Sequence, residues 1–344
     1  MDQATAIRER ALQLGYSKCG IINVDEVKGY QEKLAARIAA FPESAVMYSR
    51  FYPFADVRQK FPWAKSLVVC IRGYGKYKIP AGLRGHIATA YLFDSRKDQA
   101  SEGYQARENL IAHLESSGIK VGYEVSGITA ARFAAQKAGL GKIRTNNFFY
   151  TAEDGSWNRI EVFAIDKELE LIEQSPLQEC PAGCRECIEA CPTKSLTEPL
   201  TMHPFRCVSF LTTLGAEQTE LAGNPLAKGC GSWIYGCDEC QKACPMNHGC
   251  FKEETDFPNL ATIADNFSLE KIIDMDDEFY LRVMQPKFWY LGPEQKWLWK
   301  VNALNAMLNS GQEKFQPYLQ KCLHDPNERV RRMAKWAGEV SGLL

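Results

Sequence analysis

Apolar residues follow two periodicities in the first half of the chain. Short runs rich in β-branched residues predict strands at 19–24, 64–72, 121–125, 147–150 and 157–165. Apolar residues at helical spacing predict helices at 2–16, 25–48, 83–117 and 130–137. Because helices alternate with strands, residues 1–175 are expected to form one domain of the α/β or α+β class.

The second half of the chain has a different organisation. A cysteine-rich segment, 176–250, follows a Gln-Ser-Pro boundary, and an acidic stretch at 252–279 is expected to be a solvated connector. Helical apolar spacing returns at 297–308, 315–323 and 329–340, with turn residues between these stretches. This pattern is typical of a small helical-repeat unit. The predicted fold class is α+β, with domains at 1–175, 176–250 and 251–344.

Composition and charge exclude several classes of protein. The chain has 344 residues, with 41 Lys and Arg against 42 Asp and Glu, so it is not a basic protein that coats nucleic acid. No apolar run approaches the roughly 18 residues of a membrane-spanning helix. The first fifteen residues mix charges with short apolar runs and lack the pattern of a secretory signal. These features predict a cytoplasmic protein with no membrane partner.

The cysteines are the strongest indication of a metal site in this sequence. Ten of the 13 lie between Cys180 and Cys250, and the odd total in a chain without an export signal argues against a disulfide framework. The run at 180–192 reads C-P-A-G-C-R-E-C-I-E-A-C-P, and the run at 237–245 reads C-D-E-C-Q-K-A-C-P. Both approximate the ferredoxin spacing C-x2-C-x2-C-x3-C-P, in which the cysteine before proline ligates the other of two clusters.

Two [4Fe-4S] clusters are therefore predicted. Structural zinc is the alternative, but a zinc site has no need of a fourth cysteine followed by proline. The runs supply seven of the eight ligands, and Cys207 and Cys230 are the nearest candidates for the eighth. Cys230 and Cys250 are also candidates for inert small residues, the commoner state of a free cysteine.

With these motifs in view, the chain resembles the epoxyqueuosine reductase family, cobalamin-dependent iron–sulfur enzymes of tRNA modification, as a divergent member. The resemblance rests on A-G-L-G at 138–141, N-N at 146–147, both cysteine runs and R-C-V-S-F-L-T at 206–212. It continues in K-V-N-A-L-N-A-M-L-N-S-G at 300–311, which resembles the HEAT-like repeat of that family.

The resemblance implies cofactors and site residues. One cluster would be held by Cys180, Cys184, Cys187 and Cys244, and the other by Cys191, Cys207, Cys237 and Cys240. A base-off cobalamin would lie between the first domain and the clusters, with Gly139, Gly141, Asn146 and Asn147 at its pocket. An external low-potential donor would supply the electrons. Basic residues of the C-terminal unit are candidates for a contact with tRNA phosphates: Arg329, Arg331, Arg332 and Lys335.

The chain departs from the family pattern where substrate chemistry is expected. Val125 stands where the family has an Asp proposed as the proton donor, and valine cannot transfer a proton. Glu124 is the candidate replacement, although a carboxylate at a strand end is more often structural. Lys142 and Arg144 replace residues that are usually Trp or Phe and Gly. The sequence thus predicts a cobalamin-dependent reductase of uncertain substrate; the alternatives are an electron-transfer or corrinoid-handling protein, or a [4Fe-4S] protein without cobalamin.

Overall fold

The computed structural model describes residues 2–215 and 218–342 and has a mixed α+β fold. Its N-terminal part is built on a four-stranded sheet of order β1-β2-β6-β3, in which every neighbouring pair is antiparallel. The strands are β1 (Lys18–Asn23), β2 (Ser66–Gly73), β3 (Val121–Gly122) and β6 (Asn158–Ile165). The expected alternation of helix and strand is present, but the antiparallel pairing makes this region α+β rather than α/β.

Both faces of the sheet are covered, which explains the continuous apolar run in β2. Val68 and Cys70 face a core formed with α1 (Gln3–Gln13) and α5 (Glu102–Ser116). Leu67, Val69 and Ile71 face the opposite core, which α6 (Ala131–Lys137) covers. Side chains alternate between the two faces of a strand, so a strand with an apolar core on each face is apolar at every position.

Two predicted elements in this part are shorter than expected. The helix predicted at 83–117 is interrupted, because α4 (Thr89–Leu92) ends before a turn and α5 begins only at Glu102. Asp94 and Arg96 form an ion pair inside that turn. The strand predicted at 121–125 pairs only at Val121 and Gly122.

The C-terminal part has its own core. It packs α14 (Lys296–Ser310) against α11 (Leu269–Asp274) and α16 (Glu328–Val340), with α15 (Gln316–Cys322) alongside α16. Segment 74–93 contributes to this core, and Tyr235 stacks on Trp299 at 4.9 Å between ring centroids. The acidic stretch is not merely a solvated connector, since it forms α10 (Leu260–Asp265) and α11, whose apolar residues are buried here.

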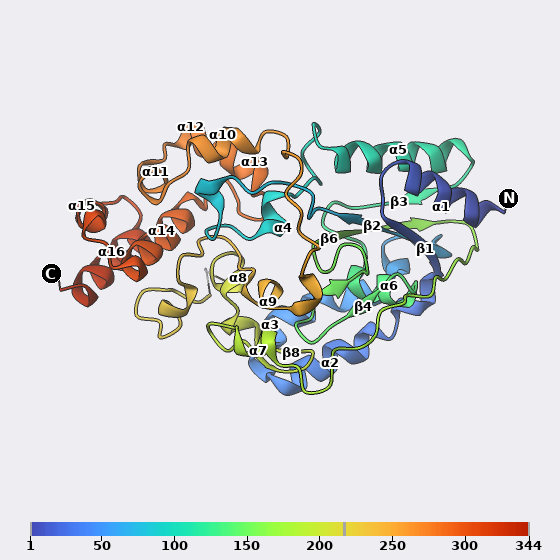
Figure 1. Ribbon diagram of the computed structural model, residues 1–344, viewed down its shortest axis with the longest axis horizontal. Coiled ribbons are helices and arrows are strands. Elements are labelled where there is room, and N and C mark those ends of the chain that lie inside the picture. Colours follow the sequence, from blue (N-terminus) through green and yellow to red (C-terminus); the bar gives the residue numbers. More distant parts are fainter. Residues whose placement is uncertain (1, 216–217, 343–344) are drawn as a thin grey trace.

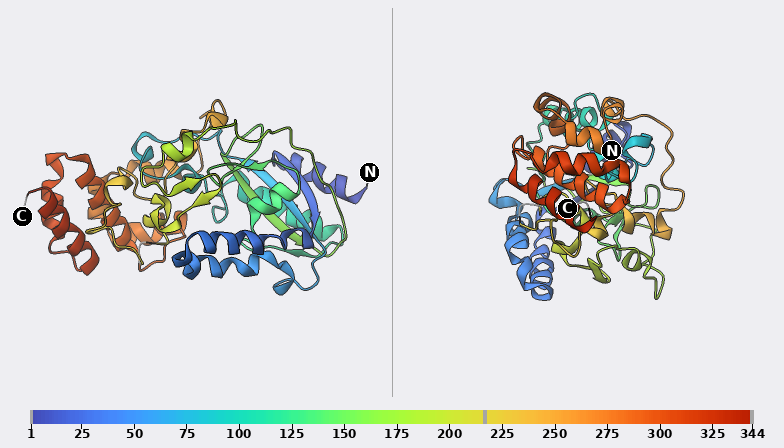
Figure 2. Two further views of the ribbon diagram at one scale, coloured as in Figure 1. Left: turned by 90° about the horizontal axis from the view of Figure 1, so that it is seen from below. Right: turned by 90° about the vertical axis from the view of Figure 1, so that its left-hand side faces the viewer.

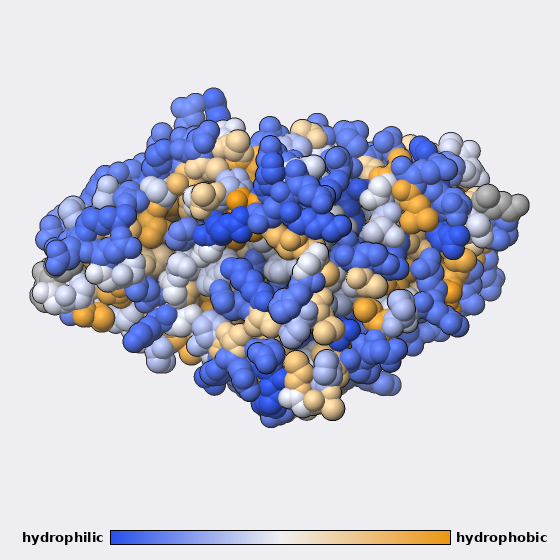
Figure 3. Space-filling model, viewed as in Figure 1, coloured by the Kyte–Doolittle hydropathy of each residue, from blue (hydrophilic) through white to orange (hydrophobic). Residues whose placement is uncertain are grey.

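The cysteine-rich segment lies between these two parts (Figure 1). Its regular elements are short, namely α7 (Glu186–Glu189), β7 (Leu196–Glu198), β8 (Thr201–Met202), α8 (Val208–Leu211) and α9 (Glu239–Lys242). Figure 2 shows the two chain ends at opposite ends of the long axis, and α2 (Tyr30–Ala40) beside the cysteine-rich segment. In the described residues no helix is long and apolar enough to cross a membrane, and the face in Figure 3 is mostly hydrophilic.

One buried cation links the C-terminal part to the interrupted helix. Lys287, at the end of α13 (Gln285–Lys287), lies 3.9 Å above the Phe257 ring and 4.0 Å from the Asp98 carboxylate. Its ammonium also donates to the backbone oxygen of Asp94 at 3.4 Å. Desolvation is the main cause that lowers the pKa of Lys287 to about 8. Burial of this cation therefore opposes folding at neutral pH.

This position predicts a specific pH dependence of stability. Below pH 8 the lysine is charged in both states, whereas between about pH 8 and 10.4 only the unfolded chain keeps the proton, so stability rises with pH. Lys287→Met should remove that rise, worth on the order of 3 kcal/mol. Denaturant midpoints of anaerobic protein at pH 7.5–10 measure it, with the exposed Lys78→Met as control. Equal pH dependence in wild type and Lys287→Met would refute the assignment.

Candidate metal centre

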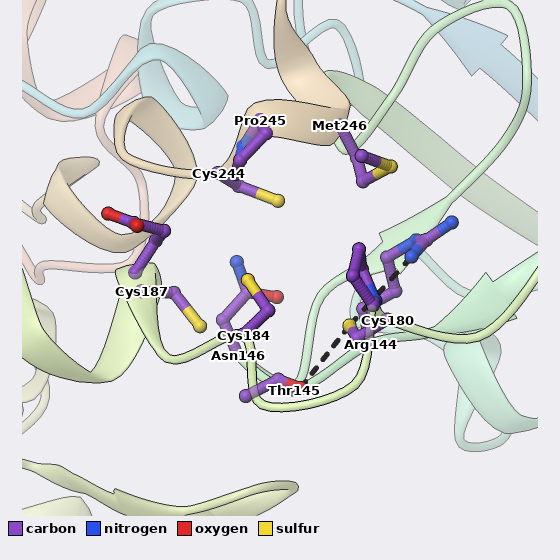
Figure 4. Close-up of a pocket in the computed structure, with 11 residues that line it drawn as sticks. Arg144, Thr145, Asn146, Cys180, Cys184, Cys187, Cys244, Pro245 and Met246 are labelled. Atoms are coloured by element: carbon purple, nitrogen blue, oxygen red, sulfur yellow. Dashed lines mark hydrogen bonds between the residues drawn. The ribbon is translucent and has the colours of Figure 1, made fainter.

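Four thiols from the two distant runs line one recess. Cys180, Cys184, Cys187 and Cys244 surround a small space that is partly open to solvent. Figure 4 shows the four sulfur atoms directed toward this space. A turn closed by the Cys184 amide on the Pro181 oxygen positions the first cysteines, and α7 carries Cys187. We call these four residues the first cysteine group.

A second cysteine group gathers Cys191, Cys207, Cys237 and Cys240. Burial raises the pKa of Cys240 well above its usual value, and the charges of Cys207, Cys237 and Cys191 raise it further, so these three thiols lie within electrostatic range of Cys240. The Cys191 sulfur accepts a hydrogen bond from the Ser195 amide at 3.2 Å. Each group therefore takes cysteines from both runs: Cys191 of the first run joins the second group, and Cys244 of the second run joins the first.

The electrostatics of the groups favour a bound polynuclear cation. Burial raises the pKa of Cys187 to about 11, with contributions from the charges of Cys244, Cys180 and Cys184. Four thiolates gathered around one space repel one another unless metal ions compensate their charge. In the described part of the chain, no three His, Cys, Asp or Glu side chains converge closely enough to hold a single metal ion. A cubane needs wider sulfur spacing than zinc, whose four ligands lie about 2.3 Å from one ion.

A turn from the sheet domain reaches into both groups. β4 (Lys142–Ile143) and β5 (Phe149–Tyr150) form a hairpin whose turn, 144–148, places Asn147 in the left-handed region at φ 65°. The Thr145 hydroxyl donates to the Cys180 sulfur at 3.3 Å. The Asn146 amide donates to the Cys240 backbone oxygen at 3.0 Å. The turn thus fixes the cysteine-rich segment against the sheet domain.

Two of the predicted corrinoid-pocket residues have a local explanation. A Cβ on Gly139 would lie 1.6 Å from the Glu173 oxygen, and one on Gly141 would lie 2.0 Å from the Tyr150 oxygen. Both glycines are therefore required by close approach of the chain's own backbone, so a corrinoid is not needed to explain them. Asn146 is engaged by Tyr150 and Cys240. Their part in corrinoid binding stays a prediction.

The fourth residue, Asn147, borders a polar recess that the sequence did not reveal. Arg37 donates to the Asn147 side-chain oxygen at 3.2 Å, and Arg132 donates to its backbone oxygen. The Asn147 side-chain nitrogen and the Tyr48 hydroxyl are buried without a hydrogen-bond partner among the described residues. Arg132 is exposed as a whole residue, yet neighbouring atoms desolvate its guanidinium and lower its pKa, and the charge of Arg37 lowers it further. We call Arg37, Tyr48, Arg132 and Asn147 the arginine recess.

The arginine recess lies next to the second cysteine group. The charge of Cys207 acts on the Tyr48 hydroxyl, whose pKa is raised mainly by burial. Residues from α2, the short α3 (Ala45–Tyr48), α6 and the hairpin turn meet there. No spacing rule connects segments so far apart in sequence, which is why sequence reasoning missed the site. Isolated arginines in predicted helices were the only signal.

The candidate proton donor Glu124 is engaged elsewhere, and so is the buried carboxylate Asp94, which shares Arg96 with Val125. Glu124 is partly exposed and forms an ion pair with Lys60. Arg96 donates to the backbone oxygen of Val125 at 3.2 Å and forms an ion pair with Asp94. Burial alone would raise the pKa of Asp94, but Arg159 and Arg96 outweigh it and hold that pKa well below its usual range. Asp94 is therefore a permanent anion in this structure and not a proton donor.

The other predicted features lie outside the two groups. Burial, and then the charge of Cys207, raise the pKa of Cys230 to about 12, while Cys250 lies beside Gly155. The basic residues of α16 all have contacts within the chain. Arg329 covers Trp297, Arg331 donates to backbone oxygens, and the remaining two form ion pairs, Arg332 with Glu220 and Lys335 with Glu339.

The comparisons first give the class of protein. Residues 179–247 match the family described as a 4Fe-4S double cluster binding domain. This range spans the two cysteine runs, so the chain is a double-cluster iron–sulfur protein, as its spacing predicted.

Full-length relatives then give the family. The epoxyqueuosine reductase of Prochlorococcus marinus (strain NATL2A) is 36% identical over 253 residues, which cover 72% of this chain and 79% of the relative. That of Xanthomonas campestris pv. campestris is 25% identical and covers 99% of this chain and 97% of the relative. The solved epoxyqueuosine reductase of Streptococcus thermophilus, 21% identical, has the same fold, with a TM-score of 0.81 over 98% of this chain and 90% of that one. A second one, solved with an epoxyqueuosine-modified tRNA stem loop, is 24% identical, with a TM-score of 0.79 over 98% of this chain and 90% of that one. The chain belongs to the epoxyqueuosine reductase family.

Proposed function

We propose that the protein is a reductase in which Cys180, Cys184, Cys187 and Cys244 hold one [4Fe-4S] cluster and Cys191, Cys207, Cys237 and Cys240 hold the other. The exchange of cysteines between the two runs carries this proposal, since it brings four thiols together in each group. The first group is open to solvent and faces an external low-potential donor. The second group lies near the arginine recess, since the charge of Cys207 acts on Tyr48, so electrons would pass from the first cluster to the second and then to this site.

The arginine recess fits a corrinoid. Two guanidiniums, a free amide nitrogen and a free hydroxyl suit the phosphodiester and amide groups of such a cofactor. When bound, the corrinoid supplies a cobalt that accepts electrons and reacts with the substrate. Arg37 and Arg132 would bind its anionic groups, and Asn147 and Tyr48 would orient it. Gly139 and Gly141 would shape the neighbouring backbone rather than contact it.

The substrate half of this proposal depends on position 125. Val125 lines an open recess of about 620 Å³ with Arg96, Lys97, Arg107 and two tyrosines, Tyr104 and Tyr123. Neither Glu124 nor Asp94 is free to deliver a proton there. This observation favours weak turnover of epoxyqueuosine in tRNA and supports, as second candidate, an electron-transfer or corrinoid-handling role. A tRNA contact through α16 would compete with the ion pair between Arg332 and Glu220 and would weaken with salt.

Cysteine replacement tests the cluster ligands. Cys244→Ala should lower the iron content of anaerobic protein from about eight to about four per chain, because a cubane with three thiolates is not retained. Cys250→Ala, six residues further along, is the matched control and should keep all the iron. Iron and acid-labile sulfide analysis gives the result. Unchanged iron in Cys244→Ala, or stoichiometric zinc in wild type, would refute the assignment.

Binding measurements test the arginine recess. Arg132→Gln should weaken binding of cob(II)alamin about tenfold, since a charge-assisted hydrogen bond is worth roughly 1.5–3 kcal/mol. Lys137→Gln, on the same helix but paired with Glu26 at the surface, is the control. Absorbance and EPR titrations under anaerobic conditions report the affinity. If wild type binds no cobalamin, or if both variants bind like wild type, the recess has another role.

Turnover of epoxyqueuosine-containing tRNA tests whether the absence of an acid at position 125 limits the reaction. Val125→Asp should raise the rate on epoxyqueuosine-containing tRNA at least tenfold, because a positioned acid typically contributes about 10²–10⁴-fold. Val121→Asp, which adds a carboxylate elsewhere in the same recess, is the control. Wild-type turnover equal to that of other family members, and unchanged by Glu124→Gln, would show that this reaction needs no acid at position 125.

A further inference from the structure

Arg144 is a buried cation with no carboxylate partner in the part of the chain that the structure describes. It is 3% exposed, and its guanidinium lies over the Tyr150 ring at 5.4 Å from the centroid. Its Nε is buried and has no hydrogen-bond partner within residues 2–215 and 218–342. Among the described residues no carboxylate forms an ion pair with Arg144, although Glu186 lines the same recess. An isolated buried charge costs several kcal/mol unless a counter-charge lies nearby.

The first cysteine group is the neighbour that can supply this counter-charge. The Nη1 atom of Arg144 lies 3.8 Å from the Cys180 sulfur, and the Thr145 hydroxyl donates to the same sulfur. Figure 4 shows both side chains at Cys180, at the edge of the space that the four thiols surround. The hairpin turn holds Arg144 in place, because its amide donates to the Phe148 oxygen at 3.0 Å and its oxygen accepts from Asn147 at 2.8 Å.

We propose that Arg144 is a positioning residue that raises the reduction potential of the first cluster by pairing its guanidinium with the Cys180 thiolate. This inference rests on the proposed cluster ligands. An oxidised cubane with four thiolates is a net dianion, and one electron makes it a trianion without uptake of a proton. A fixed cation within hydrogen-bond distance stabilises the trianion more than the dianion. The first cluster is thereby kept reducible by the external donor.

The effect is expected at the first cluster and not at the second. Arg144 touches the first group only, whereas the hairpin turn reaches the second group through the neutral amide of Asn146. Coulomb interactions weaken with distance and are stronger in buried surroundings than in water. The potential of the second cluster therefore serves as an internal reference within each sample.

Redox titration of the intact protein tests the proposal. Titanium(III) citrate supplies single electrons and becomes titanium(IV), and EPR monitors the reduced clusters. In Arg144→Gln the reduction equilibrium of the first cluster should shift at least tenfold toward the oxidised form, about 59 mV for a one-electron couple. Arg144→Lys keeps the charge and should restore most of the potential. Lys142→Gln removes a cation of the same hairpin, two residues before Arg144, that pairs with Glu179 near the surface, and should leave the potential unchanged.

The outcomes separate this inference from the proposed function. Cys244→Ala identifies the signal of the first cluster by its loss. If Arg144→Gln keeps its full iron content and its first cluster has the same potential as in wild type, the role of Arg144 is overturned and the proposed function is not. The same holds if Lys142→Gln shifts the potential of the first cluster as much as Arg144→Gln does. If Arg144→Gln loses the cluster, a tenfold shift in Arg144→Lys would also overturn it, since the charge is kept there. Wild type without iron would overturn the proposed function and this inference together.

Discussion

The structure depends on the convergence of eight thiols into two groups, each with members from both cysteine runs. In its described residues, the segment that carries them has short helices and one two-stranded ribbon, and its own apolar cluster contains four buried residues, two of them cysteines. Apolar residues of its second half, such as Trp233 and Tyr235, pack into the C-terminal core, but a cluster of four residues cannot hold the first half by burial alone. Bonds between sulfur and metal would supply the missing stability and fix the relative positions of the runs. The exchange of Cys191 and Cys244 makes each group depend on the other.

This segment is also held from both sides. The turn 144–148 attaches it to the sheet domain through Asn146, and α14 attaches it to the C-terminal core. Asn302 donates from α14 to the backbone oxygens of Thr212 and Ile234, at 3.0 and 2.8 Å. Such contacts explain how cysteines on irregular loops keep a fixed geometry. The arginine recess forms where the same turn meets α2 and α6.

The sequence predicted the local features well and the distant ones poorly. The strands at Ser66–Gly73 and Asn158–Ile165 follow from apolar runs, and the double-cluster class follows from cysteine spacing. The interruption of the helix at 83–117 was missed because Asp94 is stabilised by Arg159, far away in sequence. The direction of the strands stayed open between α/β and α+β, because alternation of elements does not define strand direction. Arg37, Tyr48 and Arg132 come together only in the folded chain.

Mössbauer spectroscopy combined with metal analysis of anaerobically purified protein tests the central claim most directly. If the two cysteine groups hold cubanes, wild type contains about eight irons per chain, and all of them give the signal of four-thiolate [4Fe-4S]²⁺ centres. Zinc in place of iron, iron in a single cluster, or a non-thiolate ligand at either cluster would contradict the account.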